Sequence, residues 1–226
     1  MIIEPVAYYR GPVGSKFGLP RQSGLAASLE GRIVFTETYR DVNAVRGLEG
    51  FDRIWLIWGF SANKPAKGVW QPTVRPPRLG GNRSMGVWST RSPFRPNPLG
   101  LSAVRLVRTE ITTDEGPVLH VSGADLMDGT PVYDIKPYIA YADAFPDAAK
   151  GFVNGAPEPQ LEVCFAVETP FPPARREALR ELLELDPRPA YQTGSDRTYG
   201  LLFDGYNVRF TVVNHLLTVT DIEYYG

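Results

Sequence analysis

The sequence has little of what metal or disulfide chemistry requires. It contains one cysteine, Cys164, among 226 residues, so neither an intramolecular disulfide nor a cysteine-rich metal site is possible. Its two histidines, His120 and His215, lie far apart, and neither has a partner at zinc-ligand spacing. We therefore expect no metal ion. Cys164 lies in the alternating run LEVCFAVE, which predicts a buried structural thiol.

Long hydrophobic runs are also absent. No stretch of about 18 apolar residues occurs, and the opening segment MIIEPVAYYRGPVG lacks the apolar centre of a signal peptide. We therefore expect a cytoplasmic protein with no membrane segment. The chain has no G-x-G-x-x-G after a strand, no G-x-x-x-x-G-K-[ST] and no G-x-S-x-G. These absences leave Rossmann, P-loop and serine-hydrolase sites without support.

One long segment lacks acidic residues altogether. Residues 53–109 contain no Asp or Glu but ten Lys and Arg residues, although the whole chain has a net charge of −1. The segment is therefore +10 and the remainder −11, which sum to −1. This asymmetry favours an anionic partner, namely phosphate, carboxylate or nucleic acid. The alternative is a solvated surface whose acidic partners come from elsewhere in the fold.

The centre of the acid-free segment, residues 70–101, is called the basic stretch below. It reads WQPTVRPPRLGGNRSMGVWSTRSPFRPNPLGL. Proline fixes φ and donates no backbone hydrogen bond, so the stretch cannot be an ordinary helix or central strand. Its large apolar content argues against disorder, and we interpret it as an ordered loop that presents arginines. Trp70, Trp88 and Phe94 suit either base stacking or burial in a core, and core is the prediction for Trp88.

Alternating apolar residues and turn signals predict a mainly β chain. The strongest strand signal, residues 51–60, is nearly all apolar, which predicts burial on both faces. One amphipathic helix is predicted at 172–185. Further strands are predicted at 2–9, 31–38, 85–89, 99–110, 117–123, 132–135, 161–168, 199–203, 206–213 and 215–224.

This order of elements restricts the fold class. Long helices do not alternate with strands, which argues against a doubly wound fold and favours an antiparallel barrel or sandwich for the first part. A stretch rich in Ala, Pro and Gly at 142–160 predicts a linker. We therefore expect a β domain at residues 1–145, a linker at 146–159 and a small α+β domain at 160–226.

A short acidic cluster complements the arginines. Asp125 and Asp128 lie near a turn, where carboxylates can accept hydrogen bonds from ribose hydroxyls or an ammonium group. Turn formation explains Asp128 equally well, because Gly129 follows it. Asn97, between two prolines, is either a turn residue or a reader of a ligand edge. The residues alone thus predict a β domain with a polyanionic or nucleotide-like ligand, and they define no reaction.

Six segments carry a more specific signal. They are PRQ (20–22), AVRGLEGF (44–51), RPPRLGGNRSMGVWSTRSPFRPNPLGLS (75–102), DLMDGTPVYDIKPY (125–138), DPRPAY (186–191) and YNVRF (206–210). Together they resemble the TrmO (TsaA-like) family of tRNA N6-threonylcarbamoyl-adenosine methyltransferases. The resemblance implies a small antiparallel β-barrel domain followed by a small α+β C-terminal domain.

The resemblance also implies an activity. The enzyme would use S-adenosylmethionine to methylate N6 of threonylcarbamoyl-adenosine next to the anticodon of tRNA. It would be a homodimer with the cofactor near the subunit interface. Two alternatives remain: a β-barrel RNA-binding module without catalysis, and a methyltransferase that acts on a small molecule.

By position, the resemblance assigns residues to the cofactor. Ser61 and Ala62 stand where the resemblance leads us to expect a His-Gln pair, so only their backbone would retain the family's contacts. The implied cofactor-contacting residues are Pro20, Arg21, Gln22, Ser61, Ala62, Arg91, Leu101, Ala124, Asp125, Leu126 and Asp128.

Other residues are expected to meet the tRNA. The threonyl carboxylate requires a cation, which Arg95 or Arg188 would supply, and the phosphates of the anticodon stem-loop require several more. For a general base the alternatives are an Asp, a Tyr or the substrate's own carboxylate. The implied substrate residues are Arg75, Arg78, Arg83, Arg95, Asn97, Arg188, Tyr191 and Arg209.

Overall fold

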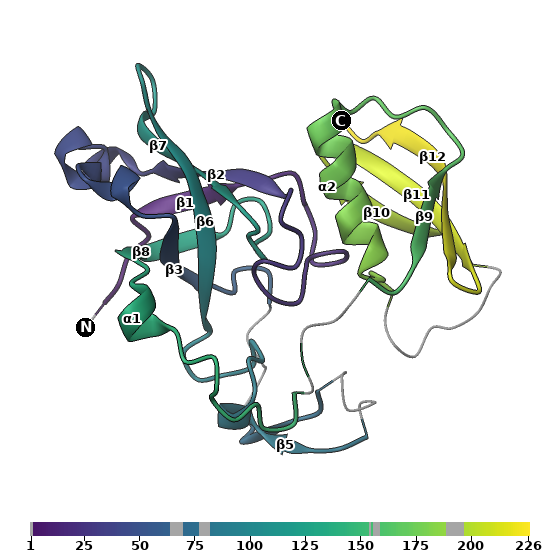
Figure 1. Ribbon diagram of the computed structural model, residues 1–226, viewed down its shortest axis with the longest axis horizontal. Coiled ribbons are helices and arrows are strands. Elements are labelled where there is room, and N and C mark those ends of the chain that lie inside the picture. The colour runs from purple at the N-terminus through teal and green to yellow at the C-terminus, as the bar shows by residue number, and fades with distance from the viewer. Residues whose placement is uncertain (1, 64–69, 77–81, 154, 156–158, 189–196) are drawn as a thin grey trace.

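A computed structural model describes residues 2–63, 70–76, 82–153, 155, 159–188 and 197–226 (Figure 1). Two of the residues predicted to meet the tRNA, Arg78 and Tyr191, lie outside the described residues. No helix within the described residues is both long enough and apolar enough to span a membrane.

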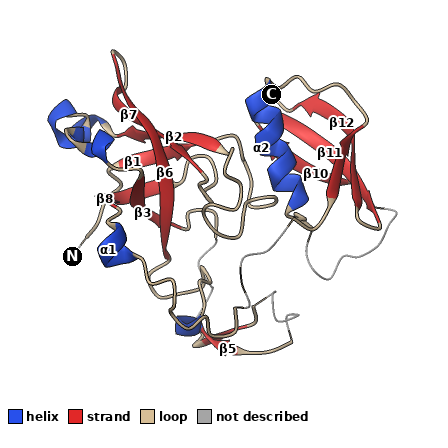
Figure 2. Cartoon of the chain, viewed as in Figure 1, coloured by secondary structure: helices blue, strands red, loops and turns tan. Residues whose placement is uncertain are grey.

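The first part of the chain is a closed barrel of six antiparallel strands in the order β1-β2-β7-β6-β3-β8 (Figure 2). Closure leaves the sheet without a free edge. Of the two folds that the strand pattern allowed, a barrel and a sandwich, the structure is the barrel. The mainly β prediction is confirmed. The barrel strands are β1 (Ala7–Arg10), β2 (Glu30–Phe35), β3 (Arg53–Gly59), β6 (Leu99–Thr112), β7 (Gly116–Ser122) and β8 (Pro131–Pro137).

Strand β3 shows how the barrel is filled. Ile54, Leu56 and Trp58 point inwards and are buried. Trp55 and Ile57 alternate with them and are only half-buried on the outer face. The prediction that both faces of this strand are buried was therefore wrong, because a barrel has one interior and its outer face borders loops and solvent.

Glycines permit close packing at the end of β1. Tyr9 is fully buried, and a Cβ built on Gly11 or on Gly31 would overlap its ring. Neither position therefore accepts a larger residue unless the ring moves. The ring belongs to the hydrophobic cluster of the barrel.

A second unit, called the C-terminal unit below, consists of β9 (Glu162–Phe165), α2 (Pro173–Glu184), β10 (Tyr199–Phe203), β11 (Tyr206–Val213) and β12 (Leu216–Tyr224). Its sheet has the order β10-β11-β12-β9, with β9 parallel to β12. The buried side chains of α2 are Ala178, Leu179, Leu182 and Leu183. Asp204 and Asn214 adopt positive φ at the turns between the last three strands.

Cys164 lies on the edge strand β9 and is exposed, so the prediction of a buried thiol was wrong. The neighbouring Val163 and Phe165 point to the core of the C-terminal unit. Because side chains alternate along a strand, Cys164 faces the other way.

The basic stretch is mostly loop, as predicted, with a small hairpin inside it. Strand β4 (Thr73–Val74) pairs with β5 (Met85–Gly86), and the 3-10 turn η5 (Val87–Ser89) follows. The remaining short helices among the described residues are η1 (Glu37–Tyr39), η2 (Val42–Val45), η3 (Leu48–Gly50) and α1 (Ala140–Asp143).

Candidate active site

A pocket of about 480 Å³ opens where the loop after β1, the C-terminal end of β3 and the basic stretch meet. Its volume falls within the range of about 300–1,000 Å³ that is typical of small-molecule sites. Four segments supply the lining residues: 16–22, 55–63, 90–101 and 125–130. The pocket is therefore built from parts of the sequence that only the barrel brings together.

Most of the residues predicted to contact a cofactor line this pocket. Ala124 and Leu126 do not, because they are buried in the barrel core. Asp128 is exposed outside the lining, where its carboxylate accepts a hydrogen bond of 3.1 Å from the backbone N–H of Gly11. The eight that line the pocket are Pro20, Arg21, Gln22, Ser61, Ala62, Arg91, Leu101 and Asp125.

A relay of two hydrogen bonds holds the Asp125 carboxylate. The indole Nε1 of Trp58 donates to Ser102 Oγ at 2.9 Å, and Ser102 Oγ donates to Asp125 Oδ1 at 2.6 Å. Trp58 and Ser102 come from the neighbouring strands β3 and β6. Burial raises the pKa of Asp125 above its ordinary value, and the Ser102 hydrogen bond and the Arg91 guanidinium partly oppose that rise.

Two arginines lie at the other side of the pocket. The Arg91 guanidinium donates to the side-chain carbonyl of Gln22. The Arg95 guanidinium donates to the backbone carbonyls of Thr90, at 2.9 Å, and Ser92, at 3.3 Å. A carboxylate and two guanidinium groups in one pocket suit a ligand that carries both hydrogen-bond donors and a negative charge.

Apolar surface completes the site. The rings of Trp58 and Phe60 pack edge to face with centroids 4.4 Å apart. Leu101 is 56% exposed at the rim.

Sequence reasoning missed Trp58, Phe60 and Ser102 as site residues. Alternation along β3 and β6 would have indicated their orientation, but not that Ser102 meets Asp125.

The aromatic residues of the basic stretch lie at the surface. Trp88 is 66% exposed, so the prediction that it belongs to the core was wrong. The physical reason is that the chain turns after Gly86, and Val87 becomes the fully buried residue. Trp88 contacts Trp70 at a centroid distance of 5.9 Å, and the Arg95 guanidinium lies 5.4 Å from its ring centroid.

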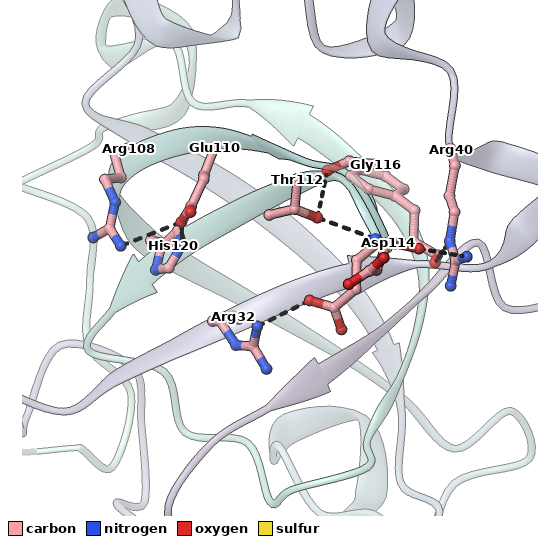
Figure 3. A network of polar contacts seen from close by, with 10 residues as sticks. Arg32, Arg40, Arg108, Glu110, Thr112, Asp114, Gly116 and His120 are labelled. Carbon is pink, nitrogen blue, oxygen red and sulfur yellow. Dashed lines mark hydrogen bonds and ion pairs between the residues drawn. The ribbon is translucent and has the colours of Figure 1, made fainter.

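The acid-free segment keeps most of its charge unpaired. Seven of its ten cations lie within the described residues, and only Arg108 forms an ion pair with a described acid, Glu110, at 3.5 Å. Figure 3 shows this pair on the outside of the barrel, where Glu110 also contacts His120 at 2.7 Å. The hydrogen bond from His120 lowers the pKa of Glu110. Among the described residues, no acid from elsewhere in the fold forms an ion pair with the other six cations.

The predicted tRNA contacts fall into two groups. Arg75, Arg83 and Asn97 are exposed on the basic stretch. Arg188 and Arg209 belong to the other part of the chain and are already neutralised by nearby acids. Arg188 contacts both carboxylate oxygens of Asp186, at 2.8 and 2.9 Å, and its side chain is only 12% exposed.

Arg209 is paired on both sides. Its guanidinium lies 3.5 Å from Asp221 and 2.8 Å from Glu223 on the adjacent strand β12. The local charge is therefore negative, which disfavours a phosphate there. Of the predicted substrate residues that the structure describes, Arg95 alone lines the pocket.

The described residues contain no metal-binding cluster, and a second pocket lies away from the described site residues. Within the described part of the chain, no group of three or more His, Cys, Asp or Glu side chains is arranged to hold a metal ion. A second pocket of about 560 Å³ lies between η2 and the outer half of β6, and it contains none of the predicted site residues.

Comparison with known proteins identifies the family. The model for the tRNA-methyltransferase O N-terminal domain matches residues 8–144, and the model for the TrmO C-terminal domain matches residues 159–224. The chain belongs to the TrmO family. The resemblance drawn from the six sequence segments is thereby confirmed.

Members of the TrmO family resemble this chain in sequence and in structure. The tRNA (adenine(37)-N6)-methyltransferase of Escherichia coli is 40% identical over 230 residues, which is 97% of each chain. The protein of the same name from Eikenella corrodens is 50% identical over 165 residues, which is 72% of this chain and 91% of that one. The crystal structure of TrmO from Pseudomonas aeruginosa superposes with a TM-score of 0.77 at 30% identity and covers 98% of both chains.

Proposed function

We propose that this protein is an S-adenosylmethionine-dependent methyltransferase that acts on N6 of adenosine 37 in tRNA. The observation that carries the proposal is the pocket that both Asp125 and Arg91 line, in a chain whose relatives are named for this activity. We further propose that the target adenosine bears a threonylcarbamoyl group, as the resemblance to the TrmO family implies.

The pocket fits S-adenosylmethionine in size and in chemistry. When bound, this cofactor supplies a methyl group attached to a positively charged sulfonium. We assign Asp125 to accept hydrogen bonds from the ribose hydroxyls or the ammonium group of the cofactor, and Arg91 and Gln22 to hold its carboxylate side. The Trp58–Phe60 pair and Leu101 provide apolar surface that excludes water. Methyl transfer from a sulfonium is an in-line displacement, so positioning of this kind is the main contribution that the chain makes.

The substrate requires a cation for its threonyl carboxylate. Arg95 is the better of the two predicted residues, since it lines the pocket and its guanidinium is oriented by backbone carbonyls. Arg188 has its guanidinium occupied by Asp186. We propose that Arg75 and Arg83, which are exposed and without a described acidic partner, meet phosphates of the anticodon stem-loop.

The exposed apolar rim supports the expected homodimer. Leu101 and Phe94 are each 56% exposed beside the pocket, and Trp88 is 66% exposed. We propose that a second copy covers part of this surface. The measured mass of the protein in solution tests the dimer: a monomer across the assayed concentrations rules it out.

We also propose that the protein works in the cytoplasm, where its tRNA substrate is, and that residues 1–145 and 160–226 form its two domains.

The activity is tested by incubating the protein with methyl-labelled S-adenosylmethionine and tRNA that bears threonylcarbamoyl-adenosine. We expect label in that tRNA and none in tRNA lacking the modification. RNA binding without affinity for S-adenosylmethionine would favour a non-catalytic RNA-binding module. Turnover of a small molecule without RNA would favour the other alternative.

The role of Arg91 is tested by Arg91→Ala, with Arg83→Ala as the matched control. Arg91→Ala is expected to weaken S-adenosylmethionine binding by roughly tenfold or more, the effect of losing a hydrogen bond to a charged group. Its tRNA affinity should change much less, whereas Arg83→Ala should show the opposite pattern. Isothermal titration with each ligand measures both. If Arg91→Ala loses tRNA affinity alone, Arg91 belongs to the RNA surface.

A further inference from the structure

The loop that joins β1 to β2, residues 11–29, is called the pocket loop below. It is far longer than the connection that two neighbouring antiparallel strands require. One side of it lines the pocket with Lys16, Leu19, Pro20, Arg21 and Gln22. Loops of this length in compact domains are usually functional, and what holds such a loop in place determines the shape of the site.

The other side of the pocket loop is buried in the C-terminal unit. Val13, Ala26 and Leu29 belong to the same hydrophobic cluster as the buried residues of α2 and β10, and each is at most 1% exposed. The Phe17 ring lies parallel to the rings of Tyr199 and Phe210, at a centroid distance of 6.4 Å from each. The loop therefore takes its apolar support from the C-terminal unit and not from the barrel interior.

Hydrogen bonds attach both ends of the pocket loop to the same unit. At the leading end, the N–H of Gly14 donates to the carbonyl of Leu202 at 3.2 Å, and the N–H of Asp204 donates to the carbonyl of Pro12 at 2.6 Å. At the trailing end, the backbone N–H and the hydroxyl of Ser28 each donate to one Glu181 carboxylate oxygen at 2.8 Å. Figure 1 shows the loop reaching from the barrel towards α2, which carries Glu181.

The trailing half of the loop connects Glu181 to the charged groups of the pocket. Gln22 accepts a hydrogen bond from Arg91. A hydrogen bond from the backbone of Ser23 lowers the pKa of Asp125. The N–H of Gly24 donates to the carbonyl of Gly123 at 2.8 Å. The segment between Gln22 and Ser28 therefore contacts both Arg91 and Asp125 at one end and Glu181 at the other.

We propose that the C-terminal unit positions the pocket loop for cofactor binding, and that Glu181 is the positioning residue that anchors its trailing end. This inference rests on the proposed function, because it takes S-adenosylmethionine as the ligand. A loop ordered in advance binds more tightly, since its conformational entropy is not lost on binding. The C-terminal unit is thus part of the cofactor site although none of its side chains lines the described pocket.

The test compares Glu181→Ala with Glu177→Ala in the full-length protein. Glu177 lies on the same helix, has a 57% exposed side chain and pairs with Arg180 instead of the loop. We expect Glu181→Ala to raise the Kd and the KM for S-adenosylmethionine roughly 10- to 100-fold, the effect of losing one or two hydrogen bonds to a charged group. The KM for tRNA and the kcat at saturating cofactor should stay within about twofold, and Glu177→Ala should match the wild type.

Conservative variants protect the test against simple misfolding. Glu181→Gln keeps one acceptor oxygen, and Ser28→Ala removes only the hydroxyl, so both should show intermediate Kd values. Wild-type cofactor affinity in Glu181→Ala, or a loss confined to kcat or to tRNA binding, overturns the inference. If the wild-type protein binds S-adenosylmethionine but methylates no tRNA, the proposed substrate fails while the Kd comparison still decides the role of Glu181.

Discussion

Replacing Ser102 by alanine tests the relay that holds Asp125. Ser102 is 2% exposed, and its hydroxyl accepts from Trp58 Nε1 at 2.9 Å and donates to Asp125 Oδ1 at 2.6 Å. The substitution leaves the buried indole N–H without a partner, which costs about 1–3 kcal/mol, and removes a hydrogen bond to a charged group, worth about 1.5–3 kcal/mol.

The two losses share one hydroxyl and are not additive, so we expect a total destabilisation of about 2–4 kcal/mol. In a chain of this length each kcal/mol shifts Tm by roughly 2–4 °C, which gives a decrease of about 5–15 °C. Ser122→Ala is the matched control, because Ser122 is a second buried serine of the barrel and takes no part in the relay. Thermal unfolding followed by circular dichroism measures both variants.

Cofactor binding should change in a defined direction with pH. The Ser102 hydrogen bond lowers the pKa of Asp125, so its loss raises that pKa further above the ordinary value. Only the ionised carboxylate accepts hydrogen bonds at both oxygens. The pH below which S-adenosylmethionine affinity falls should therefore move upward in Ser102→Ala. Titrations between about pH 5 and 8 measure it. A wild-type pH profile together with a wild-type Tm would refute the relay.

Two further predictions concern charge. Because burial raises the pKa of Asp125, its ionised form opposes folding at pH values above that raised pKa. Asp125→Asn should therefore increase Tm at neutral pH, and this gain should disappear as the pH falls below the ordinary pKa of aspartate. The same substitution should weaken S-adenosylmethionine binding. A lower Tm at neutral pH would contradict the first part. Arg209→Ala should leave tRNA affinity unchanged because Asp221 and Glu223 neutralise Arg209, whereas Arg83→Ala should weaken tRNA binding and reduce the salt slope by about 1. Filter binding at several salt concentrations measures both, and equal losses would show that Arg209 also meets phosphate.

The sequence by itself determined the fold class and the family. Period-two alternation is a local property, so the β-rich first part and the single long helix α2 were readable from residue order. The missing acids of residues 53–109 predicted an anionic partner, and among the described cations of this segment only Arg108 pairs with a described acid. The segments in 75–102 and 125–138 were specific enough to indicate the TrmO family.

Tertiary structure decided where these residues act. Trp58, Ser102 and Asp125 meet only because β3 and β6 are neighbours in the closed barrel, a long-range pairing that local sequence does not encode. The pairing of β11 with the following strand β12 brings Asp221 and Glu223 to Arg209, and these acids neutralise it.

The tertiary structure also decided which apolar side chains are exposed. The apolar runs around Trp88 and Cys164 predicted burial, but neighbouring side chains took the buried positions. Val87 took the inward position in place of Trp88, and Val163 and Phe165 took it in place of Cys164. Which of several apolar side chains is buried depends on the surface that each element meets, and only the assembled fold supplies that surface.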